Sequence, residues 1–114
     1  MILGRAPDEV LGRLMAQREV ATHPFVIGEL AMGNIRRRTV VLAELAKLPV
    51  VTVAAHTEVM FLIDERRLFA SGIGYIDAHL VAAAQLTPDV ALWTRDRRLH
   101  QVADRLGLAA RFTH

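Results

Sequence analysis

The fold class is indicated most clearly by residues 90–99, which read VALWTRDRRL. The apolar run from Val90 to Thr94 predicts a buried strand, and apolar residues then recur at helical spacing from Leu99 to Leu106. After the helix-ending Gly107, Leu108–Phe112 could form another strand. Short apolar strands that alternate with helices predict a parallel sheet covered on both faces. We therefore expect an α/β domain.

The rest of the chain continues this alternation. Brief β-branched or apolar runs at residues 20–22 and 50–53 predict strands. Proline starts, glycine or proline stops and apolar residues at helical spacing predict the remaining helices. They run from about Pro7 to Arg18, Pro24 to Gly33, Ile35 to Leu48, Val59 to Leu68, and across an alanine-rich stretch that contains Ile76, Leu80 and Ala84.

Length and composition exclude several classes of protein. The chain has 114 residues and is 53% hydrophobic, which suits one packed domain spanning residues 1–114. It contains no cysteine, so disulfides, thiolate zinc sites and cysteine nucleophiles are impossible. No apolar run approaches the length of roughly 20 residues that a membrane span needs. We expect a soluble cytoplasmic protein without a membrane partner.

The basic residues are almost all arginine. Thirteen of the fourteen are Arg, and the sequence pI is about 9.9. Arginine binds phosphate through a planar pair of donors, so a polyanionic partner fits, although genomic base composition explains the same bias. The run Arg36–Arg38 is open to two interpretations, a solvated helix face or a contact with backbone phosphates.

Three carboxylates suggest a metal site. Glu29, Asp77 and Asp96 each lie near the start of a helix-patterned segment or early in it. In parallel sheets, ligands bind beyond the carboxyl ends of the strands, and Asp96 closely follows a predicted strand. Hard divalent cations select carboxylate oxygens, so a cluster of these residues would bind Mg²⁺ or Mn²⁺. The first hypothesis is metal-assisted phosphodiester chemistry.

Each carboxylate also has a structural explanation. Asp96 is well placed as a helix N-cap, and one of its oxygens could cap while the other faces a metal. Asp77 could stabilise the positive end of its helix, and Glu29 could simply face water. His23 and His79 are candidate ligands or bases, but an isolated histidine is usually structural or exposed.

Three ordered motifs together resemble a known family, the PIN-domain ribonuclease toxins of bacterial VapBC toxin–antitoxin modules. The resemblance covers about Val20 to Leu108. The residues that carry it are His23-Pro24 followed by GELAMG at 28–33, GIGYIDAHL at 72–80, and LWTRDRRL at 92–99.

The resemblance implies a fold and an activity. PIN toxins have a three-layer α/β/α fold and cut RNA with Mg²⁺ or Mn²⁺ held by acids. Glu29, Asp77 and Asp96 match the second, third and fourth family acids, and Thr94 matches the supporting polar residue before the last. Arg95 and Arg97 are then candidate RNA contacts. The implied partners are an antitoxin, a second copy of the chain and, through the antitoxin complex, operator DNA.

The beginning of the chain departs from the family pattern. Family members carry the first acid at the end of an apolar strand, whereas here Met1-Ile2-Leu3 passes directly to Gly4. Asp8 is the nearest carboxylate, but its place after Pro7 indicates a helix start. With one acid fewer, metal affinity and turnover should fall, and a shortened central strand favours dimerisation. The alternative function is an impaired PIN-like domain that serves as an antitoxin-binding and dimerisation module.

Overall fold

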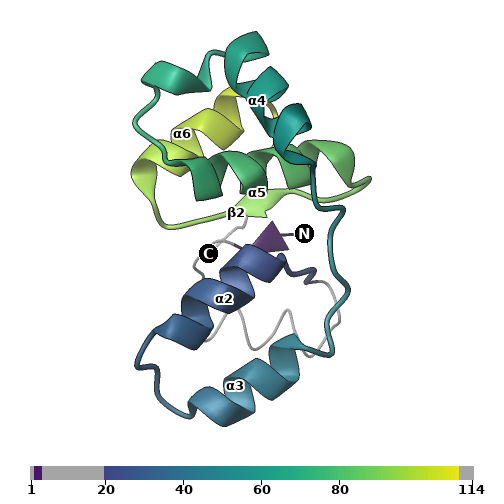
Figure 1. Ribbon diagram of the computed structural model, residues 1–114, viewed down its shortest axis with the longest axis vertical. Helices are drawn as coiled ribbons and strands as arrows, with labels where there is room; N and C mark the ends of the chain where they lie inside the picture. Colours follow the sequence, from purple (N-terminus) through teal and green to yellow (C-terminus); the bar gives the residue numbers. More distant parts are fainter. Residues whose placement is uncertain (1, 4–19, 111–114) are drawn as a thin grey trace.

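The computed structural model describes residues 2–3 and 20–110. Two short strands lie in the middle of the molecule, with one group of helices above them and another below (Figure 1). Strands and helices together confirm the α/β class, while the helix predicted for residues 7–18 lies outside the described residues. In chain order the elements are β1 (Ile2–Leu3), α2 (Pro24–Met32), α3 (Arg38–Leu45), α4 (His56–Glu65), the 3₁₀ turn η1 (Leu68–Ala70), α5 (Tyr75–Leu86), β2 (Leu92–Trp93) and α6 (Arg97–Arg105).

The strand pairing in the described residues is parallel, as the alternating pattern predicts. Ile2 lies opposite Leu92 in the β1–β2 pair. Leu92 also forms a parallel bridge with Ala109, and a separate parallel bridge joins Thr22 to Val50. The sheet is nevertheless smaller than expected, because the described residues of the runs predicted as strands at 20–22, 50–53 and 108–112 form isolated bridges rather than longer strands, while residues 111 and 112 lie outside the described residues.

One reason why residues 50–53 form only a bridge is a competing hydrogen bond. Val51 donates its backbone N–H to the carbonyl of Thr22 at 2.9 Å, as a strand residue would. The next amide, that of Thr52, instead donates to the hydroxyl oxygen of Thr87 at 3.0 Å. Thr87 is the residue that ends α5. The segment therefore turns from strand pairing to a contact with a helix end.

One helix is shorter than predicted, and another lies earlier in the chain than predicted. The helix expected from Ile35 begins only at Arg38, because Arg37 adopts the left-handed conformation with φ 55°. The Arg38 guanidinium donates to the carbonyl of Ala31 at 2.8 and 3.0 Å and so ties the start of α3 to α2. The helix expected at Val59–Leu68 instead runs from His56 to Glu65, and a second left-handed residue, Arg67, separates it from η1.

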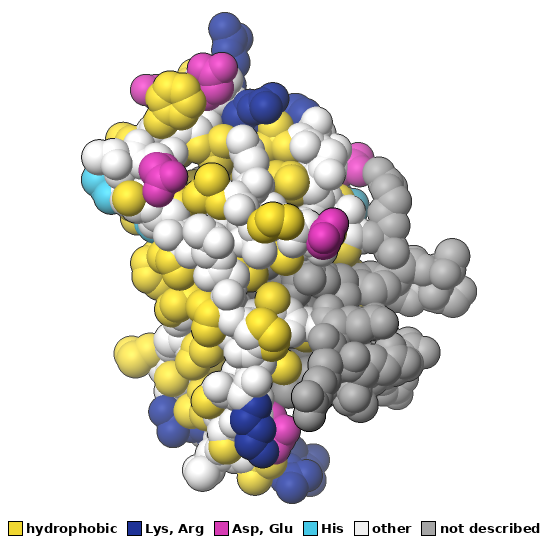
Figure 2. Space-filling model, turned by 90° about the vertical axis from the view of Figure 1, so that its right-hand side faces the viewer, with side chains coloured by type: hydrophobic (Ala, Val, Ile, Leu, Met, Phe, Trp, Pro, Cys, Tyr) yellow, Lys and Arg dark blue, Asp and Glu magenta, His cyan; other side chains and the backbone are white. Residues whose placement is uncertain are grey.

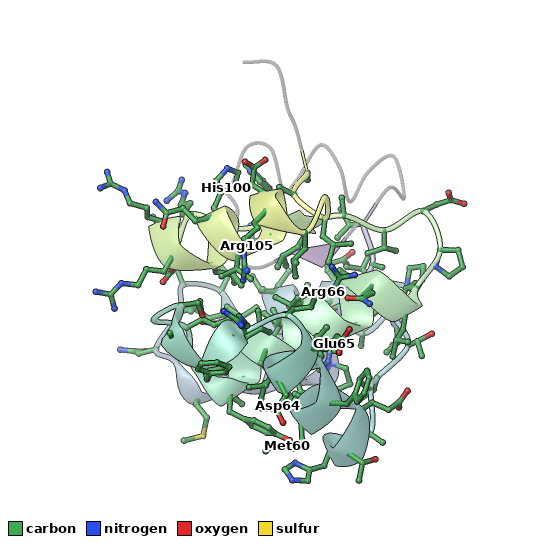
Figure 3. All side chains as sticks on the ribbon, turned by 90° about the horizontal axis from the view of Figure 1, so that it is seen from above. Met60, Asp64, Glu65, Arg66, His100 and Arg105 are labelled. Carbon is green, nitrogen blue, oxygen red and sulfur yellow. The ribbon has the colours of Figure 1, made fainter. Side chains whose placement is uncertain are left out.

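The core lies where α4, α5, α6 and β2 meet. Small alanine side chains on α5 let its neighbours pack closely, so this helix is buried along much of its length. Figure 3 shows α6 on one side of the view and α4 on the other, and Arg105 of α6 donates to the carbonyl of Arg66 at 3.0 Å. Buried residues from the four elements include Val59, Leu62, Val81, Ala83, Leu92, Leu99 and Val102.

Charge and apolar surface separate on one face of the molecule. In Figure 2 the Lys and Arg side chains gather toward the two ends of the face, and hydrophobic side chains occupy much of its middle. Among the described residues, no helix combines the length and the apolar character that crossing a bilayer would require.

Candidate active site

Asp96 is fixed by hydrogen bonds at both its backbone and its side chain. Its Oδ1 accepts from the backbone N–H of Leu99 at 3.0 Å and so caps α6. Its own backbone N–H donates to the hydroxyl oxygen of Thr94, also at 3.0 Å. Thr94 is buried directly after β2, whereas Asp96 is exposed. The predicted capping role is confirmed, and Oδ2 makes no hydrogen bond within the described part of the chain.

Asp77 lies in the first turn of α5. Gly74 precedes the helix and supplies no side-chain cap, so an acid in the first turn stabilises the positive helix end. The Asp77 side chain is half-buried, while Ile76 beside it is exposed. The approach to the helix turns at Gly72, whose φ of +87° is a conformation that favours glycine.

Glu29 lies in the middle of α2 with its side chain exposed. It borders a shallow depression that extends across to the start of α5. Glu29 therefore shares a surface with Ile76, the residue next to Asp77. The residues that line the depression are Pro24, Phe25, Gly28, Glu29, Met32 and Ile76.

The three predicted ligands lie on or at the start of three different helices and do not enclose one ion in the described part of the chain. The helices α5 and α6 begin at the same end of the molecule, on the left in Figure 1. Within residues 2–3 and 20–110, however, no group of three or more His, Asp or Glu side chains is close enough together to hold a metal ion. The chemistry of the donors suits Mg²⁺ or Mn²⁺, whereas their spacing here does not. The three-acid site stays a prediction.

The two histidines considered as ligands or bases have structural contacts instead. His23 is fully buried, and its Nδ1 accepts from the backbone N–H of Phe25 at 3.0 Å, which caps α2. Nε2 of His79 lies 2.9 Å from the hydroxyl of Tyr75, whose hydroxyl also contacts Nδ1 of His56. Burial lowers the pKa of His23, and neighbouring His79 lowers this pKa further. Burial is also the main cause of the lowered pKa of His79, with His56 contributing.

The arginines near Asp96 are exposed and sit at an electrostatically unfavourable place. Arg95 precedes the cap, and Arg97 and Arg98 occupy the first turn of α6 without an acid beside them in that turn. Cations near a helix N-terminus oppose the helix dipole. These side chains therefore do not stabilise α6 through their charge, and they offer positive charge next to Asp96.

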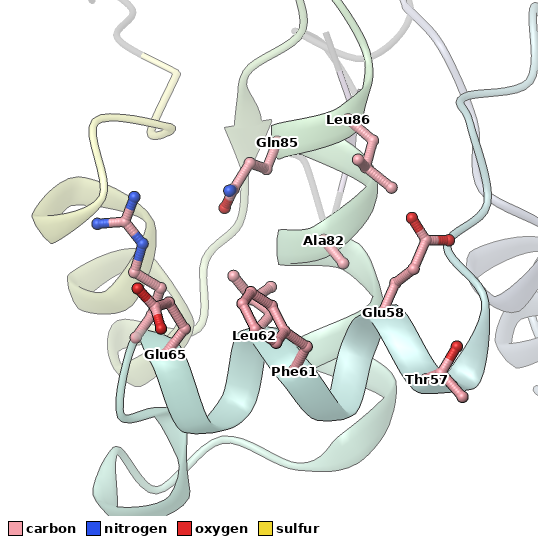
Figure 4. Close-up of a pocket in the computed structure, with 9 residues that line it drawn as sticks. Thr57, Glu58, Phe61, Leu62, Glu65, Ala82, Gln85 and Leu86 are labelled. Atoms are coloured by element: carbon pink, nitrogen blue, oxygen red, sulfur yellow. The ribbon is translucent and has the colours of Figure 1, made fainter.

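A cavity of about 370 Å³ lies away from these acids, between α4 and α5 (Figure 4). Its floor is apolar, with Leu62 and Ala82 at the base, and Glu58 and Glu65 stand along α4. The sequence offered no signal for this groove, because its residues read as ordinary core and surface positions of two helices. It contains none of the predicted site residues.

Comparison with known proteins decides the family. The PIN-domain family matches residues 3–105 of the chain. The chain belongs to the PIN-domain family. Two curated relatives, both called Ribonuclease VapC32, come from the CDC 1551 / Oshkosh and ATCC 25618 / H37Rv strains of Mycobacterium tuberculosis. Each is 43% identical over 105 residues, which is 92% of this PIN domain and 85% of the relative.

These similarities confirm the resemblance to VapC-type PIN toxins that the three motifs indicated. All three motifs fall within the matched range. No solved structure matches this PIN domain in the structural comparison. The roles of individual residues therefore have to be argued from the contacts described above.

Proposed function

We propose that this PIN domain is a metal-dependent endoribonuclease of toxin–antitoxin type, which hydrolyses RNA phosphodiester bonds at Glu29, Asp77 and Asp96. The observation that carries the proposal is the placement of Asp77 and Asp96 at the starts of α5 and α6, in a chain 43% identical to a protein named a ribonuclease. Glu29 borders a depression that is also lined by Ile76, the residue next to Asp77. The paired strands would form the central layer of a three-layer α/β/α fold.

The predicted site residues would have two roles, binding the metal ion and binding the RNA. The carboxylates of Glu29, Asp77 and Asp96 would be the ligands, with Thr94 holding the backbone of Asp96 in place. A bound Mg²⁺ or Mn²⁺ would supply an activated water and offset the negative charge that develops on the phosphoryl group. The acids must move closer together for this to occur, since their present spacing does not hold an ion.

The arginines around Asp96 support an RNA substrate. Arg95 and Arg97 are exposed beside a carboxylate, and the dipole of α6 disfavours their charge. RNA phosphates would stabilise these guanidinium groups through charge-assisted, bidentate hydrogen bonds. We therefore assign Arg95 and Arg97 to binding of the RNA backbone.

A second candidate function is favoured by the open spacing of the three acids. In this alternative the domain is catalytically impaired and acts as an antitoxin-binding and dimerisation module. Both functions imply a cognate antitoxin, a homodimer, and operator DNA contacted only through the antitoxin complex. Both also place the protein in the cytoplasm.

RNA cleavage separates the two functions. Purified protein is incubated with a structured RNA and Mn²⁺, in parallel with the Asp77→Asn variant and with a sample containing a chelator. The nuclease proposal expects cleavage by the wild type that both the substitution and the chelator abolish. Equal background in all three samples would leave the binding module as the function.

A further inference from the structure

The turn before α5 carries a close contact from α6. A Cβ atom added at Gly72 would lie 2.8 Å from Cδ of Arg98, 3.3 Å from Nε and 3.4 Å from Nη1. The side chain of Arg98 therefore lies directly over the backbone of Gly72. At Gly74, two residues along the same turn, an added Cβ would meet nothing within 4 Å. The contact is specific to Gly72.

This contact joins the two segments that carry Asp77 and Asp96. Gly72 lies in the approach to α5, whose first turn contains Asp77. Arg98 lies in the first turn of α6, which Asp96 caps. Both helices also pack against β2. Arg98 thus adds a direct side-chain contact between the beginnings of two helices that otherwise share a strand.

The turn is anchored from the opposite direction as well. The hydroxyl of Ser71 donates to the carbonyl of Leu68 at 2.6 Å, which ties the turn back to η1. Gly72 then takes its left-handed conformation. With one side of the turn tied to η1, packing by Arg98 restrains the other side.

Helix stability does not account for the choice of arginine at this position. Arg98 is exposed at the positive end of α6, where a cation is unfavourable. A long side chain can still gain by covering backbone and apolar surface with its alkyl stem. The stem of Arg98 does this at Gly72.

We propose that Arg98 is a positioning residue that braces the turn at residues 71–74 and thereby fixes Asp77 relative to Asp96. The inference rests on the proposed nuclease function for its consequence in catalysis, and on the Gly72 contact alone for the brace. Arg95 and Arg97, on either side of Asp96, remain the residues assigned to RNA.

Amide hydrogen exchange tests the brace in protein without metal or RNA. In Arg98→Ala, the amides of residues 73–78 should exchange about ten-fold faster, because opening of the turn becomes easier. Arg98→Met keeps the unbranched stem without the charge and should exchange like the wild type. Gln101→Ala on the same helix is the matched control. Unchanged exchange in Arg98→Ala, or equal acceleration in Gln101→Ala, would overturn the brace.

RNA cleavage then tests the consequence for the site. Arg98→Ala should lower kcat about ten-fold with KM nearly unchanged, because a misplaced carboxylate affects chemistry more than RNA binding. Arg98→Met should restore kcat, and a raised KM with normal kcat would instead make Arg98 an RNA contact and overturn the positioning role. If the wild type cleaves no RNA, the proposed function fails, while the exchange experiment still decides the brace.

The glycine side of the contact gives a reciprocal comparison. Gly72→Ala places a methyl group against Arg98 and strains a positive φ, whereas Gly74→Ala does neither. Adding Arg98→Ala to Gly72→Ala removes the collision but leaves the backbone strain. The double variant should therefore regain part of the thermal stability that Gly72→Ala loses. A double variant no more stable than Gly72→Ala would contradict close packing of Arg98 on Gly72.

Discussion

The hydroxyl oxygen of Thr94 accepts a 3.0 Å hydrogen bond from the backbone N–H of Asp96. Thr94 is buried at the end of β2, and Asp96 is exposed at the start of α6. A rigid strand end therefore determines where an exposed carboxylate begins its helix. This relationship gives Thr94 a structural role that can be separated from the chemical role proposed for Asp96.

Replacing Thr94 by valine removes the acceptor while keeping the shape of the side chain. The backbone N–H of Asp96 would lose its partner, so we expect the free energy of unfolding to fall by about 1 kcal/mol. RNA cleavage should fall too, because Asp96 is less firmly held. Chemical denaturation measures the first effect, and Thr94→Ser, which keeps the hydroxyl, should be close to wild type. A fully stable Thr94→Val would show that the hydrogen bond contributes nothing.

Asp96 combines a cap with a proposed ligand, and two substitutions separate them. Asparagine keeps the N-cap oxygen but loses the charge, so Asp96→Asn should retain its melting temperature and lose about 100-fold or more in cleavage rate. Asp96→Ala loses the cap as well and should unfold about 1 kcal/mol more easily. Normal cleavage by Asp96→Asn would restrict this residue to capping.

Arg38 should matter for stability more than its neighbours in the arginine run. It donates two hydrogen bonds to the carbonyl of Ala31 and so joins α2 to α3. Arg38→Ala is expected to lower the free energy of unfolding by about 1 kcal/mol. The control, Arg36→Ala, changes an exposed side chain and should stay within about 0.5 kcal/mol of wild type. Thermal melts of both variants test the difference.

Buried His23 should make the folded state less stable at mildly acidic pH. Burial lowers the pKa of His23 below the ordinary value of 6.5. As the pH falls below 6.5, the unfolded chain therefore binds a proton at His23 more readily than the folded chain does. Its contribution is therefore complete above pH 6.5 and is lost as the pH falls below that value. Melting temperatures between about pH 7.5 and about pH 5.5 should decline with acidity. His23→Asn keeps a capping side chain and should flatten this decline, so an unchanged decline in this variant would contradict the role of His23.

Much of the fold could be predicted because strong local signals agree with packing. Pro24 begins α2, and the strand pattern around Leu92 marks the centre of the sheet. The errors fall where no local signal exists. Arginine is not a residue type that predicts a left-handed conformation, yet Arg37 and Arg67 both adopt one. Arg37 delays the start of α3, and Arg67 follows the end of α4.

Of the candidate site, the structure confirms only the capping role predicted for Asp96. The pattern of strand, loop and helix predicted the cap at Asp96, whereas Thr94 was singled out only by the family resemblance. Spacing in sequence cannot give the separation of Glu29, Asp77 and Asp96, because it depends on how α2 packs across α5. The contact between Arg98 and Gly72 is likewise tertiary, since it links the first turn of α6 to the turn that precedes α5.

The central claim is that Glu29, Asp77 and Asp96 bind one divalent ion together. Titration of isotope-labelled protein with Mn²⁺ tests it most directly, because the paramagnetic ion broadens the NMR signals of nearby nuclei. If the three acids share one ion, the backbone signals of all three residues should broaden together, with one apparent dissociation constant, and Asp77→Asn should weaken the broadening at the other two. Broadening at a single acid, or at none of the three, would contradict it.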